Sequence, residues 1–452
     1  MNRAAPSRRL GMISLGCAKN LVDSEVMLGH LAAGGWTFVR DPREADVLVV
    51  NTCSFIGPAR EESIQAILEA AEYKKTGRLQ RLIVAGCLVQ RYAQELQREL
   101  PEVDAFVGLD QLDRIIGAAE PEAAGPPVEL PVWSRSSYLY DDRVPRRRAT
   151  PHWTAYVKIA EGCDHTCSFC AIPAFRGSFR SRQPDSILRE ARQLAQEGVR
   201  EINLIAQDSS HYGRDLQRKD GLAHLLEGLD QVELLRWIRV HYLYPNTISE
   251  RLIETMARAR RVVDYVDLPL QHADPDALRR MRRGGSAASH LKLLSSFREA
   301  MPKPALRSTF IVGFPGETES EFEALLDFVR TVRFHHLGVF TYSHEDGTSA
   351  FGLEDDVPES VKQERRDRLM ECQQRIAFER NHELLQQQVE VLVEGAHADT
   401  EHLLVGRMQS QAPDVDGQIL INEGLAEPGE FVMVELSETA GYDLVGRIVG
   451  PA

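Results

Sequence analysis

The stretch that decides the fold is Ala155-Tyr-Val-Lys-Ile-Ala160-Glu-Gly-Cys163-Asp-His-Thr-Cys167-Ser-Phe-Cys170. Its first six residues are mostly apolar and predict a buried strand. Three cysteines follow that strand directly, separated by three and then by two residues. A strand that runs into a cysteine-rich loop predicts a ligand site at the strand's carboxyl end, where open α/β sheets bind their ligands.

This cysteine spacing predicts an iron–sulfur site. Thiolates are the usual protein ligands of such clusters, and three of them hold a four-iron cluster while leaving one iron open to a small molecule. The alternative is a structural zinc site, which normally needs four closed ligands. His165, inside the same loop, is the available fourth ligand for zinc.

Strand and helix signals alternate from about residue 152 to residue 343, and this alternation predicts a full or partial α/β barrel. The predicted strands are Ala155–Ala160, Glu201–Ala206, Trp237–Tyr242, Tyr265–Pro269, Ser308–Gly313 and His336–Thr341. A polar helix is expected after them, over Pro358–Leu385.

The N-terminal part shows the same alternation and carries three further cysteines. Short apolar runs predict an open parallel sheet with helices on both faces. The runs are Met12–Leu15, Asp46–Val50, Arg81–Ala85 and Ala105–Val107. Cys17, Cys53 and Cys87 each follow such a run, so they should meet at one sheet edge and hold a second cluster. The alternative is three buried structural cysteines.

The C-terminal part changes to a period of two, which predicts a small antiparallel β-barrel of roughly five strands. These changes of pattern suggest a domain over 1–120, a linker over 121–150, a second domain over 151–386 and the barrel over 387–452. The linker is rich in proline and ends in a basic run, Arg143 and 146–148. We expect this run to be solvated, with a phosphate contact as the alternative.

Composition excludes several classes of protein. The chain has 452 residues, a net charge of −14 and seven cysteines. An odd number of cysteines without a secretion signal argues against a disulfide framework. No apolar run is long enough for a membrane helix. We therefore expect a cytoplasmic protein with no membrane partner, a short disordered tail before residue 10, and Cys372 either packed or free at the surface.

The cysteine loop after the first strand of an α/β barrel resembles the radical S-adenosylmethionine (SAM) superfamily. The stretch Phe310-Ile-Val-Gly313-Phe-Pro-Gly316-Glu317 resembles that family's cofactor-binding strand end. The resemblance implies that SAM binds the open iron of the Cys163, Cys167 and Cys170 cluster. It also implies that Phe169 packs near the adenine and that Gly313 and Gly316 contact the cofactor.

The order of the three domains, ending in a TRAM-like substrate-binding barrel, resembles the methylthiotransferases of that superfamily. One branch modifies an anticodon-loop adenosine of tRNA, and another modifies an aspartate of small-subunit ribosomal protein twelve. Five stretches resemble the second branch: Ser14-Leu-Gly-Cys17-Ala-Lys-Asn20, Ile172-Pro-Ala-Phe-Arg176-Gly177, Ala206-Gln-Asp208-Ser-Ser-His-Tyr212-Gly, Tyr242-Leu-Tyr-Pro245 and Ala412-Pro-Asp-Val-Asp-Gly417.

The resemblance implies two four-iron clusters and two molecules of SAM per reaction. One SAM methylates sulfur on the Cys17, Cys53 and Cys87 cluster. The other yields a radical that removes hydrogen from the aspartate β-carbon. An electron donor is then a required partner, and no acid/base pair is assigned. An iron–sulfur electron carrier would need no third domain, and a metal-stabilised RNA-binding module would need a basic surface.

Charge favours a protein substrate over tRNA. From residue 391 to residue 452 there are eleven acidic residues and only two basic ones, Arg407 and Arg447. The acidic residues are Glu394, Asp399, Glu401, Asp414, Asp416, Glu423, Glu427, Glu430, Glu435, Glu438 and Asp443. Such a barrel repels phosphates and attracts a basic ribosomal protein. A merely solubilising acidic surface is the alternative.

Overall fold

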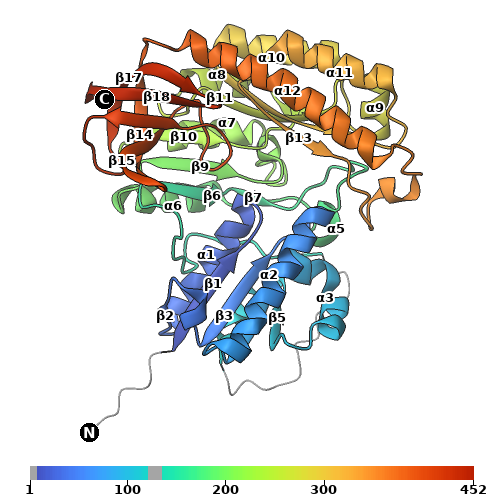
Figure 1. Cartoon of the computed structure of the whole chain (residues 1–452), viewed down its shortest axis with the longest axis vertical. Coiled ribbons are helices and arrows are strands. Elements are labelled where there is room, and N and C mark those ends of the chain that lie inside the picture. The colour runs from blue at the N-terminus through green and yellow to red at the C-terminus, as the bar shows by residue number, and fades with distance from the viewer. Residues whose placement is uncertain (1–7, 121–134) are drawn as a thin grey trace.

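The computed structural model describes residues 8–120 and 135–452 and contains three units (Figure 1). An N-terminal sheet domain lies below a larger central domain, and a small barrel packs against the side of the central domain. The expected tail falls largely on residues 1–7, and the first half of the expected linker falls on residues 121–134. Both lie outside the described residues.

The N-terminal sheet is parallel throughout, with strand order β2-β1-β3-β4-β5. All six residues of β3 are buried, as expected for a strand covered by helices on both faces. This confirms the predicted sheet and adds the two-residue strand β2 at its edge. The elements are β1 Arg9–Ser14, α1 Ala18–Ala33, β2 Thr37–Phe38, η1 Pro42–Glu44, β3 Val47–Thr52, α2 Gly57–Thr76, β4 Arg81–Gly86, α3 Cys87–Glu99, β5 Ala105–Val107, η2 Leu109–Arg114 and α4 Ile115–Ala119.

The central domain holds six parallel strands in two sheets, ordered β6-β9-β10 and β11-β12-β13. A single bridge between Ile238 and Val262 joins the two sheets, so together they form the predicted partial barrel. The six strands are β6 Thr154–Lys158, β9 Glu201–Ile205, β10 Trp237–Val240, β11 Tyr265–Gln271, β12 Ala305–Val312 and β13 His336–Thr341. Two short strands, β7 Ala160–Glu161 and β8 Arg180–Ser181, form a separate antiparallel pair.

Helices cover the outer side of the central strands (Figure 1). The predicted polar helix is α12, and its residues Leu369, Cys372 and Ile376 belong to the main hydrophobic core. Cys372 is therefore a packing residue and not a surface thiol. The helices are α5 Ile172–Phe175, α6 Pro184–Gln196, η3 Ser209–His211, α7 Gly221–Leu229, η4 Pro245–Thr247, α8 Glu250–Arg258, α9 Pro275–Arg280, α10 Ala287–Ala300, α11 Glu319–Val332, η5 Ser349–Gly352 and α12 Glu359–Glu383.

The C-terminal unit is a closed five-stranded barrel, as predicted, with order β14-β15-β16-β18-β17. Four of its five pairings are antiparallel, and the β16–β18 pairing is parallel. The parallel pairing arises because β17 crosses the barrel before β18 returns antiparallel to it. The strands are β14 Gln388–His397, β15 Thr400–Met408, β16 Ile419–Glu423, β17 Phe431–Ala440 and β18 Asp443–Pro451.

The barrel docks at the amino ends of the central strands. Glu201, the first residue of β9, is fully buried and accepts from Arg407 of the barrel at 2.7 Å. Tyr265, the first residue of β11, donates to Asp416 at 2.7 Å. Trp237, the first residue of β10, donates to Glu390 at 3.1 Å. The carboxyl ends of these strands are thus left for another partner, the N-terminal domain.

The basic run before the central domain is not solvated as a whole, which corrects that prediction. The Arg146 side chain is 9% exposed and forms ion pairs with Glu25 at 2.5 Å and with Glu190 at 2.6 Å. Arg147 lies over the Phe38 ring. The segment is therefore anchored between the two domains through Arg146, while Arg143 and Arg147 remain exposed. Among the described helices, none is long and apolar enough to span a membrane.

Candidate metal centres

The first cysteine set lies where three neighbouring strands of the N-terminal sheet end. Cys17 follows β1 and caps α1, Cys53 follows β3, and Cys87 opens α3 directly after β4. Gly16 has a φ of +86°, and a Cβ there would lie 2.7 Å from the Cys53 Cβ. Only glycine therefore allows the backbone to bring Cys17 and Cys53 so close together.

Two asparagines hold the loops that carry these cysteines. The Asn20 amide donates to the carbonyl of Leu15 at 2.7 Å and to that of Thr52 at 3.2 Å. The Asn51 amide donates to the carbonyl of Asn20 at 2.9 Å and to the Ser24 hydroxyl at 2.7 Å. Because these bonds are buried, they fix the loops after β1 and β3 relative to each other.

The electrostatic environment differs among the three thiols. The pKa of Cys87 is raised to about 12, mainly by burial; Arg176 opposes this rise, and the neighbouring Cys53 and Cys17 contribute to it. Burial also raises the pKa of Cys53. Burial alone would raise the pKa of Cys17, but the positive charges of Lys19 and Arg176 bring it below its ordinary value. The three thiols thus influence one another, as ligands of one centre do.

The second cysteine set lies in the loop after β7, at the carboxyl side of the central strands. The backbone N–H of Cys163 donates to the Gly177 carbonyl at 3.1 Å, and that of Ser168 donates to the Met281 carbonyl at 2.9 Å. Arg283 donates to the Cys167 sulfur at 3.5 Å. The pKa values of Cys163 and Cys170 are both raised to about 12, mainly by burial, with a smaller contribution from Cys167.

His165 contacts Asp208 and Tyr244, whereas in a zinc site it would bind the metal together with the three cysteines. Its Nε2 lies 2.6 Å from the Asp208 carboxylate, and its ring stacks on Tyr244 at 3.8 Å between centroids. A single zinc ion would need its sulfur ligands about 4 Å apart. Among the described side chains, the groups whose ligand atoms all lie within 4.8 Å of one another include neither cysteine set. The wider spacing fits a cluster, in which each thiolate binds a separate iron.

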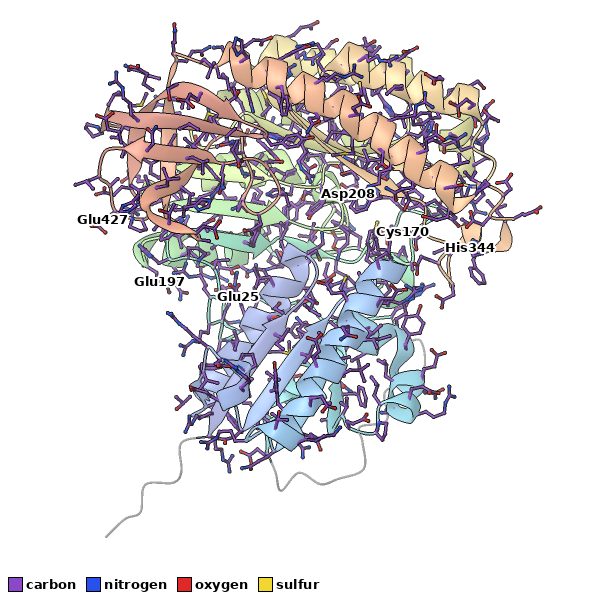
Figure 2. All side chains as sticks on the ribbon, in the orientation of Figure 1. Glu25, Cys170, Glu197, Asp208, His344 and Glu427 are labelled. Atoms are coloured by element: carbon purple, nitrogen blue, oxygen red, sulfur yellow. The ribbon has the colours of Figure 1, made fainter. Side chains whose placement is uncertain are left out.

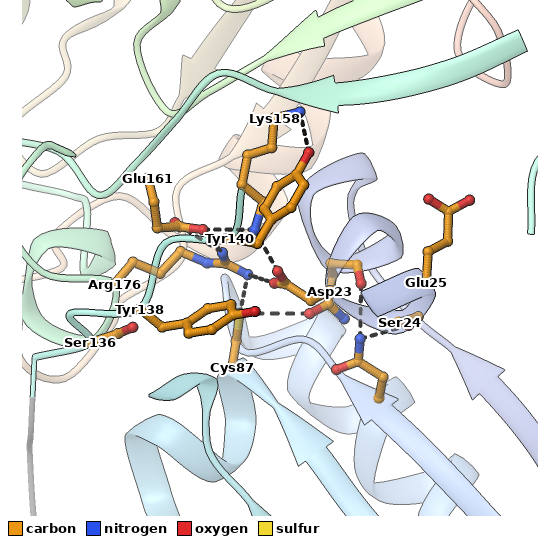
Figure 3. A network of polar contacts seen from close by, with 12 residues as sticks. Asp23, Ser24, Glu25, Cys87, Ser136, Tyr138, Tyr140, Lys158, Glu161 and Arg176 are labelled. Atoms are coloured by element: carbon orange, nitrogen blue, oxygen red, sulfur yellow. Dashed lines mark hydrogen bonds and ion pairs between the residues drawn. The ribbon is translucent and has the colours of Figure 1, made fainter. Parts of the chain in front are cut away.

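A buried network of charges joins the two sets across the domain interface (Figure 3). Arg176, from the loop of the second set, donates to the Cys87 sulfur at 3.0 Å and to Asp23 of α1 at 3.1 Å. It also donates to Glu161 at 2.9 Å. Lys158 bridges the same two carboxylates. The network fixes how the first set faces the second.

Sequence reasoning assigned no role to these four charged residues. Three of them, Lys158, Glu161 and Arg176, lie inside stretches quoted above, and Asp23 lies three residues after one of them. The signal that could have identified them is the presence of a charged residue within an apolar stretch next to a cysteine. The partner of Arg176 could not be predicted from the sequence, because Arg176 and Cys87 are 89 positions apart in the chain.

The expected cofactor contacts lie beside the second set. Phe169 packs against the apolar group formed by Phe314, Met281 and Tyr342. Gly313 and Gly316 have φ values of +71° and +74°, and the turn between them leaves the end of β12. The structure thus brings Phe169 next to the glycine turn. In Figure 2, Cys170 and Asp208 lie where the central and N-terminal domains meet.

Family comparisons agree with the three-unit architecture. Residues 157–329 match the radical SAM superfamily, residues 9–108 match Uncharacterized protein family UPF0004, and residues 387–449 match the TRAM domain. A solved radical SAM methyltransferase, TsrM from Kitasatospora setae, covers 76% of this chain and 74% of its own length with a TM-score of 0.55. At 14% identity, that likeness concerns the fold alone.

Curated relatives match nearly the whole chain. A protein of Solibacter usitatus named ribosomal protein uS12 methylthiotransferase RimO is 50% identical over 98% of this chain and 95% of its own length. Proteins of the same name from Myxococcus xanthus and Geobacter sulfurreducens are 49% and 47% identical over 98% of this chain, covering 92% and 98% of their own lengths. With both cysteine sets in place, this chain belongs to the ribosomal protein uS12 methylthiotransferase family of the radical SAM superfamily.

Proposed function

We propose that this enzyme transfers a methylthio group to the β-carbon of an aspartate in ribosomal protein uS12. The observation that carries the proposal is the pair of three-thiol sets at strand carboxyl ends, which Arg176 brings face to face. Relatives of 47–50% identity that bear the uS12 name support the substrate. Such a substrate places the reaction in the cytoplasm.

Each set is suited to a four-iron cluster with one open iron. Cys17, Cys53 and Cys87 would hold one cluster, and Cys163, Cys167 and Cys170 the other. SAM would bind beside the second set, against Phe169 and the turn at Gly313 and Gly316. Together these groups supply the substrate radical and the methylthio group, with electrons from a separate donor. We assign the donor no site on this chain.

The chain's own task is to position the groups and exclude water. Asp23, Lys158, Glu161 and Arg176 are all buried, and their opposite charges are paired with one another. A rigid paired network keeps the two sets in fixed relation without a mobile joint, and fixed geometry of this kind lowers the barrier to transfer. None of these residues is required to donate or accept a proton.

The direct test is mass spectrometry of uS12 and of tRNA after incubation with anaerobically reconstituted enzyme, SAM, a sulfide source and a reductant. We expect uS12 to gain one methylthio group in place of one hydrogen, with the fragment ions placing it on an aspartate. Transfer RNA should be unchanged. Methylthiolated tRNA together with unmodified uS12 would contradict the proposal and favour the tRNA branch.

The outer surface of the barrel supports a basic protein partner. The exposed acidic residues are Asp399, Asp414, Glu423, Glu427, Glu430 and Glu438. Of the two basic residues, Arg407 is buried, so Arg447 is the exposed one. Asp416, by contrast, faces the central domain and pairs with Arg307 at 3.5 Å. The exposed charge is therefore strongly negative, which favours a cationic partner and disfavours phosphates.

Reversing part of this charge should slow modification without harming the radical chemistry. Glu427 lies on the outer side of the barrel, across the molecule from Cys170 (Figure 2). We expect the triple change Glu423→Lys, Glu427→Lys, Glu430→Lys to lower kcat/KM for uS12 by about tenfold at low salt. The loss should shrink as ionic strength rises.

The measurement is the rate of uS12 modification from 50 to 500 mM salt, with SAM cleavage followed in parallel. The matched control replaces the same three residues by glutamine, which removes charge without reversing it and should give an intermediate loss. An unchanged kcat/KM in the lysine variant would show that the acidic surface serves solubility alone.

A further inference from the structure

Lys19 is a buried cation without a carboxylate partner. It lies in the first turn of α1, two residues after Cys17, and is only 8% exposed. Its ammonium lies 3.5 Å from the centroid of the Tyr242 ring and 3.5 Å from the Ala206 carbonyl oxygen. Within residues 8–120 and 135–452, no Asp or Glu lies within ion-pair distance of it. Burying a lysine in this way is costly unless an anion completes the site.

Most other buried lysines and arginines of this protein pair with a carboxylate, and Lys19 does not. Among the described residues, ten lysines and arginines are buried, and eight of them pair with a carboxylate. The eight are Arg91, Lys158, Arg176, Arg182, Arg239, Lys362, Arg365 and Arg407. The ninth, Arg283, donates to the Cys167 sulfur. Lys19 has no carboxylate: its ammonium meets an aromatic face and, at long range, a carbonyl, and its charge acts on the nearby Cys17 thiol.

The Lys19 side chain links the loop of the first cysteine set to the carboxyl ends of two central strands. Its own backbone adjoins Cys17 of the first set. Its two contacts, Ala206 and Tyr242, follow the carboxyl ends of β9 and β10. Two residues beyond each of these contacts, Asp208 and Tyr244 hold His165 in the loop of the second set. Lys19 therefore reaches from the sulfur-donating side to the mouth of the barrel.

Tyr242 is held in place for this contact. Its φ is +59°, a left-handed conformation that a tyrosine rarely adopts. Its backbone N–H donates to the buried Asp267 at 3.0 Å, which keeps the residue in that conformation. A fixed aromatic face beneath an ammonium orients the cation but cannot replace an anion.

We propose that Lys19 binds the side-chain carboxylate of the target aspartate and holds its β-carbon between the two centres. This inference rests on the proposed function, because it requires an aspartate substrate. The carboxylate adjoins the β-carbon, so an ammonium that grips it fixes the reacting carbon to within one bond. Lys19 is thus a specificity-determining residue that selects a carboxylate over a neutral side chain.

A second carboxylate in the reaction is that of the methionine part of SAM. The open iron of the second set is the expected ligand for that group, and Lys19 belongs instead to the loop of the first set. We therefore assign Lys19 to the substrate, and the experiment measures SAM affinity separately to distinguish the two sources.

The test is a double-mutant cycle with reconstituted enzyme and a peptide that spans the methylthiolated aspartate of uS12. Peptide affinity is measured by fluorescence anisotropy for the native peptide and for its Asp→Asn form. The enzymes are the unaltered protein, Lys19→Met, Lys19→Arg, and the control Lys75→Met. Lys75 is a lysine of the same domain that is largely exposed at the end of α2. Iron content and SAM affinity are measured for each enzyme.

We expect the unaltered enzyme to bind the native peptide at least about tenfold more tightly than the Asn peptide. Lys19→Met should bind both peptides equally weakly, Lys19→Arg should keep part of the preference, and Lys75→Met should match the unaltered enzyme. SAM affinity and iron content should stay within twofold throughout. If Lys19→Met fails to fold, the ratio of the unaltered enzyme's affinities for the native and the Asn peptide still tests the inference.

Three results would overturn the inference. One is equal affinity of the unaltered enzyme for the two peptides. Another is an Asp preference that persists in Lys19→Met. The third is a fall in SAM affinity in that variant with unchanged peptide binding, which would assign Lys19 to the cofactor. Failure of the proposed function gives a different result, since the unaltered enzyme would then leave whole uS12 unmodified.

Discussion

Replacing Cys163, Cys167 and Cys170 by alanine will abolish SAM cleavage and remove about half of the iron from the reconstituted enzyme. The unaltered protein should bind about eight irons per chain, four at each set. The reason is that, in the proposed function, the second set would hold the open iron that binds SAM. Iron is measured by colorimetric assay, and cleavage by the appearance of 5′-deoxyadenosine.

The reciprocal variant separates the two roles. Replacing Cys17, Cys53 and Cys87 by alanine should also remove about four irons. It should leave SAM cleavage largely intact while methylthiolation of uS12 disappears. Cys372→Ala is the matched control, because this cysteine packs in the core and should change neither iron content nor either activity. If this variant folds and keeps iron at the second set but no longer cleaves SAM, the two cysteine sets do not have separate roles.

The second large effect concerns stability. Glu201→Gln should lower the free energy of unfolding by about 3–5 kcal/mol, because it leaves the buried Arg239 without a carboxylate and the buried Arg407 with Glu394 alone. Chemical denaturation at neutral pH measures this loss. The control is Glu227→Gln, which breaks a half-exposed pair with Arg251 and should cost less than about 1 kcal/mol. Equal losses in the two variants would contradict the role assigned to Glu201.

The same carboxylate predicts a pH dependence. Burial alone would raise the pKa of Glu201, but Arg407 and Arg239 lower it to about 2. Because the folded pKa lies below the unfolded value, the stabilisation is complete above about pH 4.5 and is lost as the pH falls toward 2. The stability difference between the unaltered protein and Glu201→Gln should therefore narrow over that range. A constant difference would show that Glu201 is not the titrating group.

The order of strands and helices was predictable because the signals are local. Apolar runs such as residues 47–50 mark buried parallel strands, and the six clustered cysteines stand shortly after such runs or after the first central strand. The edge strand β2 has only two residues and gives no periodic signal. The basic run was misjudged because the acceptors of Arg146 lie 121 and 44 positions away. Contacts at such separations are set by domain packing, which no local pattern records.

The bond between Arg176 and Cys87 has a consequence for the order of assembly. The N-terminal domain leaves the ribosome before residue 176 has been synthesised, since the two partners lie 89 positions apart. Until the loop of the second set has docked, Cys87 lacks its guanidinium donor and Asp23 lacks both of its cations. The first cysteine set therefore acquires its full set of contacts only after the loop that follows it by 89 positions has been made and has docked.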